Sequence, residues 1–102
     1  MTIIPVTIAP AGTLSNGVAI PGPIVGLQIP TLTSSIVYLQ ASIDGITYSR
    51  VIVNDGSGAD WTIPASTGGK FIFLDNLAVF PWLLVECGSA QTNGATFNFI
   101  IK

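Results

Sequence analysis

The feature of this sequence that most restricts its fold is the recurrence of turn-forming residues along all of its 102 residues, at intervals of roughly 8–12. Short segments rich in Val, Ile, Thr, Phe and Tyr separate the turns, and these residue types favour strands. No stretch of ten or more residues has helical periodicity. We therefore predict an all-β, two-sheet antiparallel sandwich. The turn signals are Pro10–Gly12, Ser15–Gly17, Pro21–Pro23, Asp44–Gly45, Asn54–Gly58, Gly68–Gly69, Asp75–Asn76 and Asn93–Gly94.

The length fits one domain, residues 1–102, with no linker inside it. Asp44–Gly45 predicts a tight hairpin, and Asp75–Phe80 is the best place for a single helical turn. Two interpretations of residues 1–10 stay open: an extended N-terminal arm that adds a strand to a neighbour, or an ordinary first strand. Strands are predicted at 2–8, 13–20, 24–29, 35–42, 46–53, 59–63, 70–74, 82–88 and 95–101.

Several predicted strands carry apolar residues on both faces. In the segment 35–42, one face carries Val37, Leu39 and Ala41, and the other face carries Ile36 and Tyr38. The same holds for 70–74, where two phenylalanines alternate with Ile72 and Leu74. One face can fill the core, and the other must meet solvent, a loop or a partner. The pattern does not decide which face points inward.

Charged residues make up only 8% of the chain, against about 25% in an ordinary soluble domain. This deficit favours extensive contacts with other subunits over the alternative of a neutral sandwich rich in Thr and Ser. We expect a homo-oligomer, for which a trimer is one closed symmetric solution. The candidate interface residues, taken from the amino terminus, the two-faced strands and an aromatic near a turn, are Ile3, Ile4, Val6, Ile36, Tyr38, Trp61, Ile72 and Ile100.

Charge and hydropathy exclude two classes of partner. The net charge of −2 with no basic stripe argues against nucleic acid and against an anionic membrane surface. The longest apolar run, Leu77–Val85, is broken by Pro81 and is too short to span a bilayer. The amino terminus lacks the basic start and apolar core of a signal peptide, so we expect synthesis and retention in a cytoplasm or export inside a larger particle.

The residues that most enzymes use are scarce. The chain has no histidine and one cysteine, which excludes serine–histidine and cysteine–histidine nucleophiles, internal disulfides and cysteine metal sites. Cys87 is expected to be a small buried hydrophobe. Most of the five acids lie at turns, where Asp bonds its own backbone. We predict no enzyme and no cofactor. The acids are Asp44, Asp55, Asp60, Asp75 and Glu86.

Three other kinds of binding site match the sequence poorly. The run 54–60 superficially resembles an acidic calcium loop but lacks its closing Glu and alternating ligands. Gly68-Gly69-Lys70 lacks the spacing of a phosphate loop. Exposed aromatics can stack on sugars, although packing is the commoner role of such rings. The rings concerned are Tyr38, Tyr48, Trp61 and Trp82.

Motifs spread over most of the chain resemble a group of small structural proteins of tailed bacteriophages. The matching pieces are Ala11–Asn16, Val25–Pro30, Tyr38–Ser42 running into Asp44–Tyr48, Trp82–Ser89 and Thr96–Ile101. The chain departs from the pattern at Thr31–Ser35, where many relatives carry a tryptophan-containing loop.

The resemblance implies a jelly-roll-like sandwich acting as a virion component. A capsid cement or decoration subunit that contacts the major capsid protein, made in the host cytoplasm and placed on the head, is the first expectation. A head–tail accessory protein, or a tail or fibre module that binds a carbohydrate or receptor, is the alternative.

Overall fold

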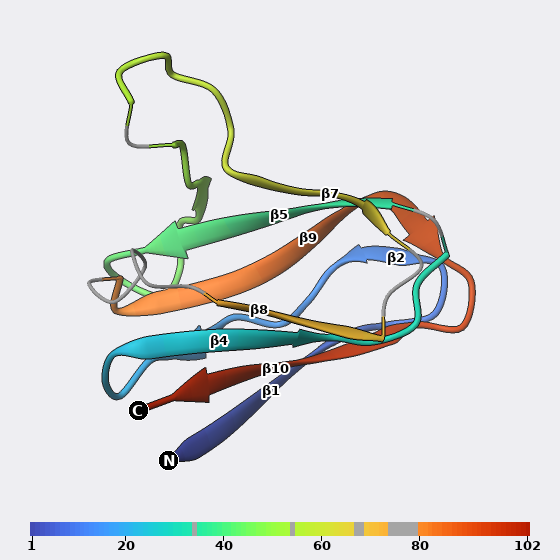
Figure 1. Ribbon diagram of the computed structural model, residues 1–102, viewed down its shortest axis with the longest axis horizontal. Coiled ribbons are helices and arrows are strands. Elements are labelled where there is room, and N and C mark those ends of the chain that lie inside the picture. Colours follow the sequence, from blue (N-terminus) through green and yellow to red (C-terminus); the bar gives the residue numbers. More distant parts are fainter. Residues whose placement is uncertain (34, 54, 67–68, 74–79) are drawn as a thin grey trace.

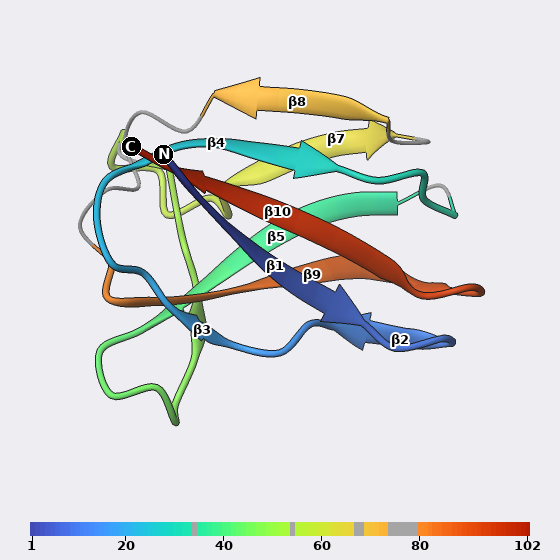
Figure 2. The same ribbon diagram turned by 90° about the horizontal axis from the view of Figure 1, so that it is seen from below.

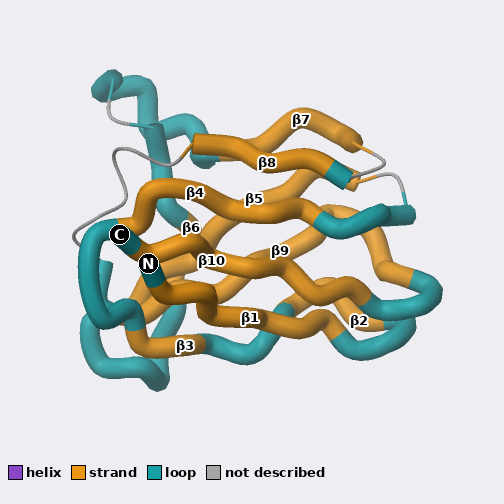
Figure 3. Tube along the Cα trace, turned by 60° about the horizontal axis from the view of Figure 1, so that its bottom comes forward, coloured by secondary structure: helices purple, strands orange, loops and turns teal. Residues whose placement is uncertain are grey.

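The protein is an antiparallel β-sandwich in a computed structural model that describes residues 1–33, 35–53, 55–66, 69–73 and 80–102, with only the backbone of 64–66. The predicted all-β class is confirmed. Within the described ranges, no helix is long and apolar enough to cross a membrane. The strands (Figures 1 and 3) are β1 (Thr2–Ile8), β2 (Gly12–Leu14), β3 (Val18–Ala19), β4 (Ile24–Ile29), β5 (Ser35–Ser42), β6 (Ser49–Arg50), β7 (Thr62–Ser66), β8 (Lys70–Phe73), β9 (Trp82–Gln91) and β10 (Ala95–Ile101).

Two sheets make the two layers, which Figure 2 shows from below. Sheet A has the order β1-β10-β4-β8, and sheet B has the order β2-β9-β5-β6, with β3 beside β9 and β7 beside β5. Each sheet therefore mixes strands from both halves of the chain. Counting β2 with β3 and β6 with β7 gives the eight strands and double Greek key of a jelly roll. The jelly-roll-like fold is thus confirmed.

The core lies between the sheets and follows the two-residue period of the strands. In β10 the odd-numbered residues point inward, and Phe97 and Phe99 are the largest fully buried side chains. β5 and β9 face them from sheet B. The other core residues include Val6, Ile8, Leu27, Ile29, Val37, Leu39, Leu83, Val85 and Cys87. Burial of Cys87 confirms its prediction as a small hydrophobe.

The predicted strands at 2–8, 24–29, 35–42 and 95–101 match the observed ones. The strand predicted at 13–20 is instead split into β2 and β3, and the one predicted at 46–53 is reduced to β6 and a bridge at Ile52. The tight hairpin at Asp44–Gly45 is wrong, because residues 43–48 form a longer loop. The predicted helical turn at 75–80 falls largely on residues outside the described ranges.

Residues 2–8 form the first strand of sheet A rather than a free arm, because all seven pair with β10. The outer edge of β1 offers few donors to another chain. Thr7 donates its backbone N–H to Asn16 Oδ1 over 2.9 Å. Pro5, two residues earlier, has the same orientation and no N–H to offer. This edge is therefore blocked against further strand pairing.

Candidate interaction surface

The surface that stands out is the outer face of sheet A, the face that points away from sheet B. Register pairs Ile3 with Ile100, Ile100 with Gly26, and Gly26 with Phe73. These four positions form one row across all four strands. Because paired residues in adjacent strands point to the same side, the row presents apolar groups and bare backbone to solvent.

A second row runs beside the first. Pro5 pairs with Asn98, Asn98 with Gln28, and Gln28 with Phe71. Asn98 Nδ2 donates to Gln28 Oε1 over 3.0 Å, so the two amides in the middle of the row bond to each other. The second row is therefore polar at its centre and apolar at both ends. Neither row contains a charged residue.

The β8 end of this face is the most exposed. The side chains of Phe71 and Phe73 are 69% and 87% exposed. They border a shallow groove of about 340 Å³, whose other lining residues are Val25, Gly26, Ile72 and Ile100. A Cβ on Gly26 would lie 3.2 Å from the Ile72 carbonyl oxygen and would narrow the groove. The lack of a side chain at Gly26 thus keeps the groove open.

The structure divides the eight predicted interface residues among different places. Ile3, 54% exposed, and the half-buried Ile100 do lie together on the outer face of sheet A. Ile36 and Tyr38 lie on sheet B instead. Ile4, Trp61 and Ile72 are half-buried against the core. The prediction that Val6 lies at an interface is wrong. Val6 is fully buried, because the even-numbered residues of β1 point inward.

Sequence reasoning did not single out Phe71 and Phe73 as surface residues. The segment 70–74 is apolar on both faces, so its pattern was compatible with either orientation. Pairing with β4 decides between them. Leu27 is fully buried and sits opposite Ile72, so Ile72 shares its side of the sheet and the flanking phenylalanines point outward.

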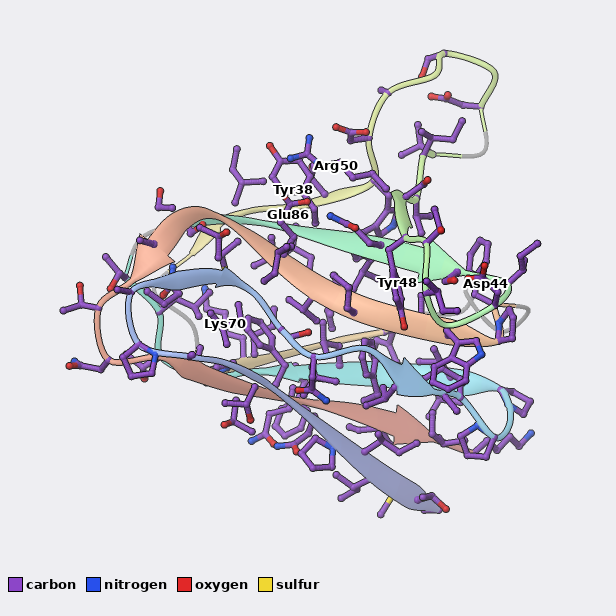
Figure 4. The ribbon with its side chains drawn as sticks, turned by 180° about the vertical axis from the view of Figure 1, so that it is seen from behind. Tyr38, Asp44, Tyr48, Arg50, Lys70 and Glu86 are labelled. Atoms are coloured by element: carbon purple, nitrogen blue, oxygen red, sulfur yellow. The ribbon has the colours of Figure 1, made fainter. Side chains whose placement is uncertain are left out.

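Sheet B has a different outer surface, built around Arg50. Its guanidinium donates from Nε and Nη2 to both carboxylate oxygens of Glu86, over 2.9 and 2.8 Å, and from Nη1 to Asp60 over 2.9 Å. It also lies 3.9 Å above the ring of Tyr38 (Figure 4). Gln40 donates to Glu86 as well. All three guanidinium nitrogens have protein partners, so the cluster fastens strands together.

The acids of the described segments form hydrogen bonds and ion pairs within the protein. The pKa of Glu86 is lowered, chiefly by its bonds to Arg50, and the pKa of Asp55 is lowered by bonds from Ser57. Asp44 accepts backbone N–H groups of Ile46 and Thr47, which lower its pKa to about 2. A general acid at neutral pH needs the opposite shift. Asp55 and Asp60, the acids of the weighed calcium loop, are thus occupied by Ser57 and Arg50.

The four rings weighed for sugar stacking are all half-buried. Tyr38 lies beneath Arg50, and Trp61 packs against the core. The hydroxyl end of Tyr48 abuts Gly17, and the Trp82 ring abuts Gly45. The rings that do reach solvent are phenylalanines, which have no hydroxyl or N–H with which to orient a sugar.

A smaller apolar patch lies on the loop between β5 and β6. Ile43 and Ile46 are 90% and 83% exposed. Their loop is fixed by Ser42 and Asp44, whose side chains accept backbone N–H groups within it. Gly45 has φ of +75° and lies against the Trp82 ring, so a side chain there would be strained and would clash. The patch is separate from the two rows of sheet A.

Comparison of the chain with protein-family models, with curated proteins and with solved structures finds no match.

Proposed function

We propose that this chain is a non-enzymatic structural subunit that attaches to a larger protein assembly through the outer face of sheet A. One observation carries the proposal: an uncharged face crosses all four strands and ends in two exposed phenylalanines. Soluble monomers rarely expose large apolar patches unless these are binding surfaces. Phenylalanine supplies apolar area without hydrogen-bonding groups, which suits contact with protein.

The assembly that we propose is the virion of a tailed bacteriophage, with the chain as a cement or decoration subunit on the major capsid protein. Support comes from the motif resemblance, from the jelly-roll topology and from the scarcity of charge. Of the eight charged residues, Arg50, Asp60 and Glu86 are paired in one cluster, whose net charge is −1. Few charges therefore remain to keep this surface apart from a partner.

The proposed mechanism is mechanical. Each copy buries the outer face of sheet A at a junction between shell subunits, and separation of the shell subunits then re-exposes that apolar area to water. Because the strands are held by a core between two sheets, the face is rigid and loses little conformational entropy on binding. Many weak contacts of this kind add up over a shell.

Re-addition of purified protein to particles that lack it tests this proposal. Wild-type protein is expected to bind saturably and to raise the temperature at which the particles release DNA. The double variant Ile3→Lys, Ile100→Lys places two charges on the face and should lower particle affinity at least tenfold. Neither residue lies in β8 or pairs with it, so the strand edge used in the next inference is unchanged.

Ile43→Lys is the matched control, because Ile43 is highly exposed but lies on the β5–β6 loop. It should bind within about twofold of wild type, since an exposed substitution off the interface changes little. Circular dichroism and thermal unfolding establish that each variant is folded. Failure of wild-type protein to bind, or equal binding by the double variant, would contradict the proposal.

A further inference from the structure

The two edges of sheet A differ in how they are protected. The β1 edge is blocked by Pro5 and by the bond from Thr7 to Asn16. β8 pairs with β4 along one side only, and in the described part of the chain no strand is hydrogen-bonded to its other side. Alternate residues of a strand direct both N–H and C=O to the same side. Part of the β8 backbone therefore faces outward without a strand partner, and β8 contains no proline.

We propose that β8 pairs antiparallel with β8 of a second copy, about a two-fold axis at Ile72, to form one continuous eight-stranded sheet. The inference rests on the proposed function only in treating the outer face of sheet A as a contact surface. A two-fold axis at Ile72 places Phe71 of each copy opposite Phe73 of the other. Both rings lie on the outer face, so two cross-strand aromatic pairs form.

The sequence of β8, Lys-Phe-Ile-Phe, is self-complementary in this register. The only charge in the strand is Lys70, which lies at its start. In the paired sheet the two Lys70 positions are four residues apart along the strand, which is about 14 Å. That distance exceeds the Debye length of about 8 Å at physiological salt, so the like charges repel little. A second copy is therefore a partner without an electrostatic penalty.

The available area predicts a weak pair. At 69% and 87% exposure, the two phenylalanines offer together roughly 300 Å² per copy, because one such ring buries 150–250 Å² when covered. A stable interface buries about 800 Å² per partner. We therefore expect a dissociation constant on the order of 100 µM. Such a pair forms when copies are concentrated, as on the surface of an assembly, where pairing also doubles the apolar face.

Sedimentation equilibrium of the isolated protein between about 10 µM and 1 mM tests the pairing. Wild type is expected to show a monomer–dimer equilibrium. Phe73→Ser should raise the dissociation constant tenfold or more. Ile3→Ser removes another large exposed apolar side chain from the same face, at the opposite edge, and should change the dissociation constant less than twofold. Strictly monomeric wild type at 1 mM, or equal weakening by the two variants, overturns the inference.

Cross-linking tests the register. A mixture of Phe71→Cys and Phe73→Cys proteins should form a disulfide between the two variants on oxidation, because the two positions are directly opposite. Each variant alone should cross-link far more slowly, since its own positions are two residues out of register. Cys87 is buried and does not compete. Faster cross-linking of either variant with itself overturns the proposed axis. A monomer that still binds particles would end this inference and leave the proposed function standing.

Discussion

At Ala11 the backbone adopts a conformation that alanine disfavours. Ala11 has φ of +64°, and Gly12 donates its N–H to the Ala9 carbonyl over 2.8 Å. With Pro10 at its second position, the turn has the arrangement of type II, whose third position favours glycine. We predict that Ala11→Gly stabilises the fold by a few tenths to about 1 kcal/mol, because relief of strain exceeds the added entropy of the unfolded chain.

Urea unfolding of wild type, Ala11→Gly and Ala90→Gly measures this effect. Ala90 is exposed in β9, where glycine brings no relief of strain, so this control should lose about 0.5–1 kcal/mol. Loss of stability in Ala11→Gly would show that the turn is not strained at that residue.

Asp44 couples stability to pH. Its folded pKa, about 2, lies below the ordinary value of 3.8, because the carboxylate accepts the N–H groups of Ile46 and Thr47. The ionised form is therefore favoured in the folded state, and the contribution is complete above the ordinary pKa. It is lost as the pH falls from about 4 to 2. Asp44→Asn should weaken the pH dependence of the melting temperature in that window, leaving the parts due to Glu86 and Asp55. Parallel pH profiles of the two proteins would contradict this account.

Among the connections between strands, the loop before β5 depends on one buried amide. Gln91 Oε1 accepts the N–H of Thr33 over 2.8 Å, and Gln91 Nε2 donates to the carbonyls of Thr33 and Ser89. The side chain thus pairs with Thr33 as a neighbouring strand would. Gln91→Leu keeps the volume and leaves the loop backbone unsatisfied, which should cost about 1–3 kcal/mol. Each kcal/mol of lost stability lowers the melting temperature by roughly 4–8 °C.

Gln40→Leu is the control for Gln91, measured by differential scanning calorimetry. Gln40 is half-buried and makes one side-chain bond, to Glu86, which keeps both of its bonds to Arg50. Its loss should cost less than about 1 kcal/mol. An equal loss in the two variants would mean that Gln91 does not brace the loop.

How far the elements follow from the sequence depends on which interactions set them. β5 and β10 are rich in residues that favour strands, and a turn signal follows β5 and precedes β10, so their ranges could be predicted to the residue. β6 is shorter than the predicted strand 46–53, because Asp44 and Ser42 hold residues 43–47 in a hydrogen-bonded loop that competes with strand pairing. Which face of β8 points outward depends on pairing with β4, which is distant in the sequence. Local periodicity carries no such information.

Only part of the candidate surface could be predicted from the sequence, for the same reason. Ile3 could be named from the apolar amino terminus and Ile100 from a two-faced strand, and pairing of β1 with β10 brings them together across most of the chain. Val6 is a β-branched apolar residue of β1, as Ile3 is, but it lies at an even-numbered position and its side chain therefore points into the core. The orientation of Phe71 and Phe73 could not be predicted, because it depends on the pairing of β8 with β4.

For the whole molecule, we propose that an uncharged face on a rigid jelly roll serves as an assembly surface. Such contacts gain little from ion pairs, so attachment to particles should be nearly independent of salt. We expect less than a threefold change in particle affinity between 50 mM and 500 mM NaCl, measured by co-sedimentation. A tenfold or greater loss at high salt would show that charged groups, and not this face, dominate the contact.

The most direct test is the copy number of this protein in gradient-purified particles, determined by quantitative mass spectrometry against the major shell protein. The account predicts a number comparable to that of the shell subunit, since each junction in the shell would hold a copy. A few copies per particle would place the chain in the tail, neck or fibres and contradict the cement role. Complete absence from particles would contradict the assignment to a virion.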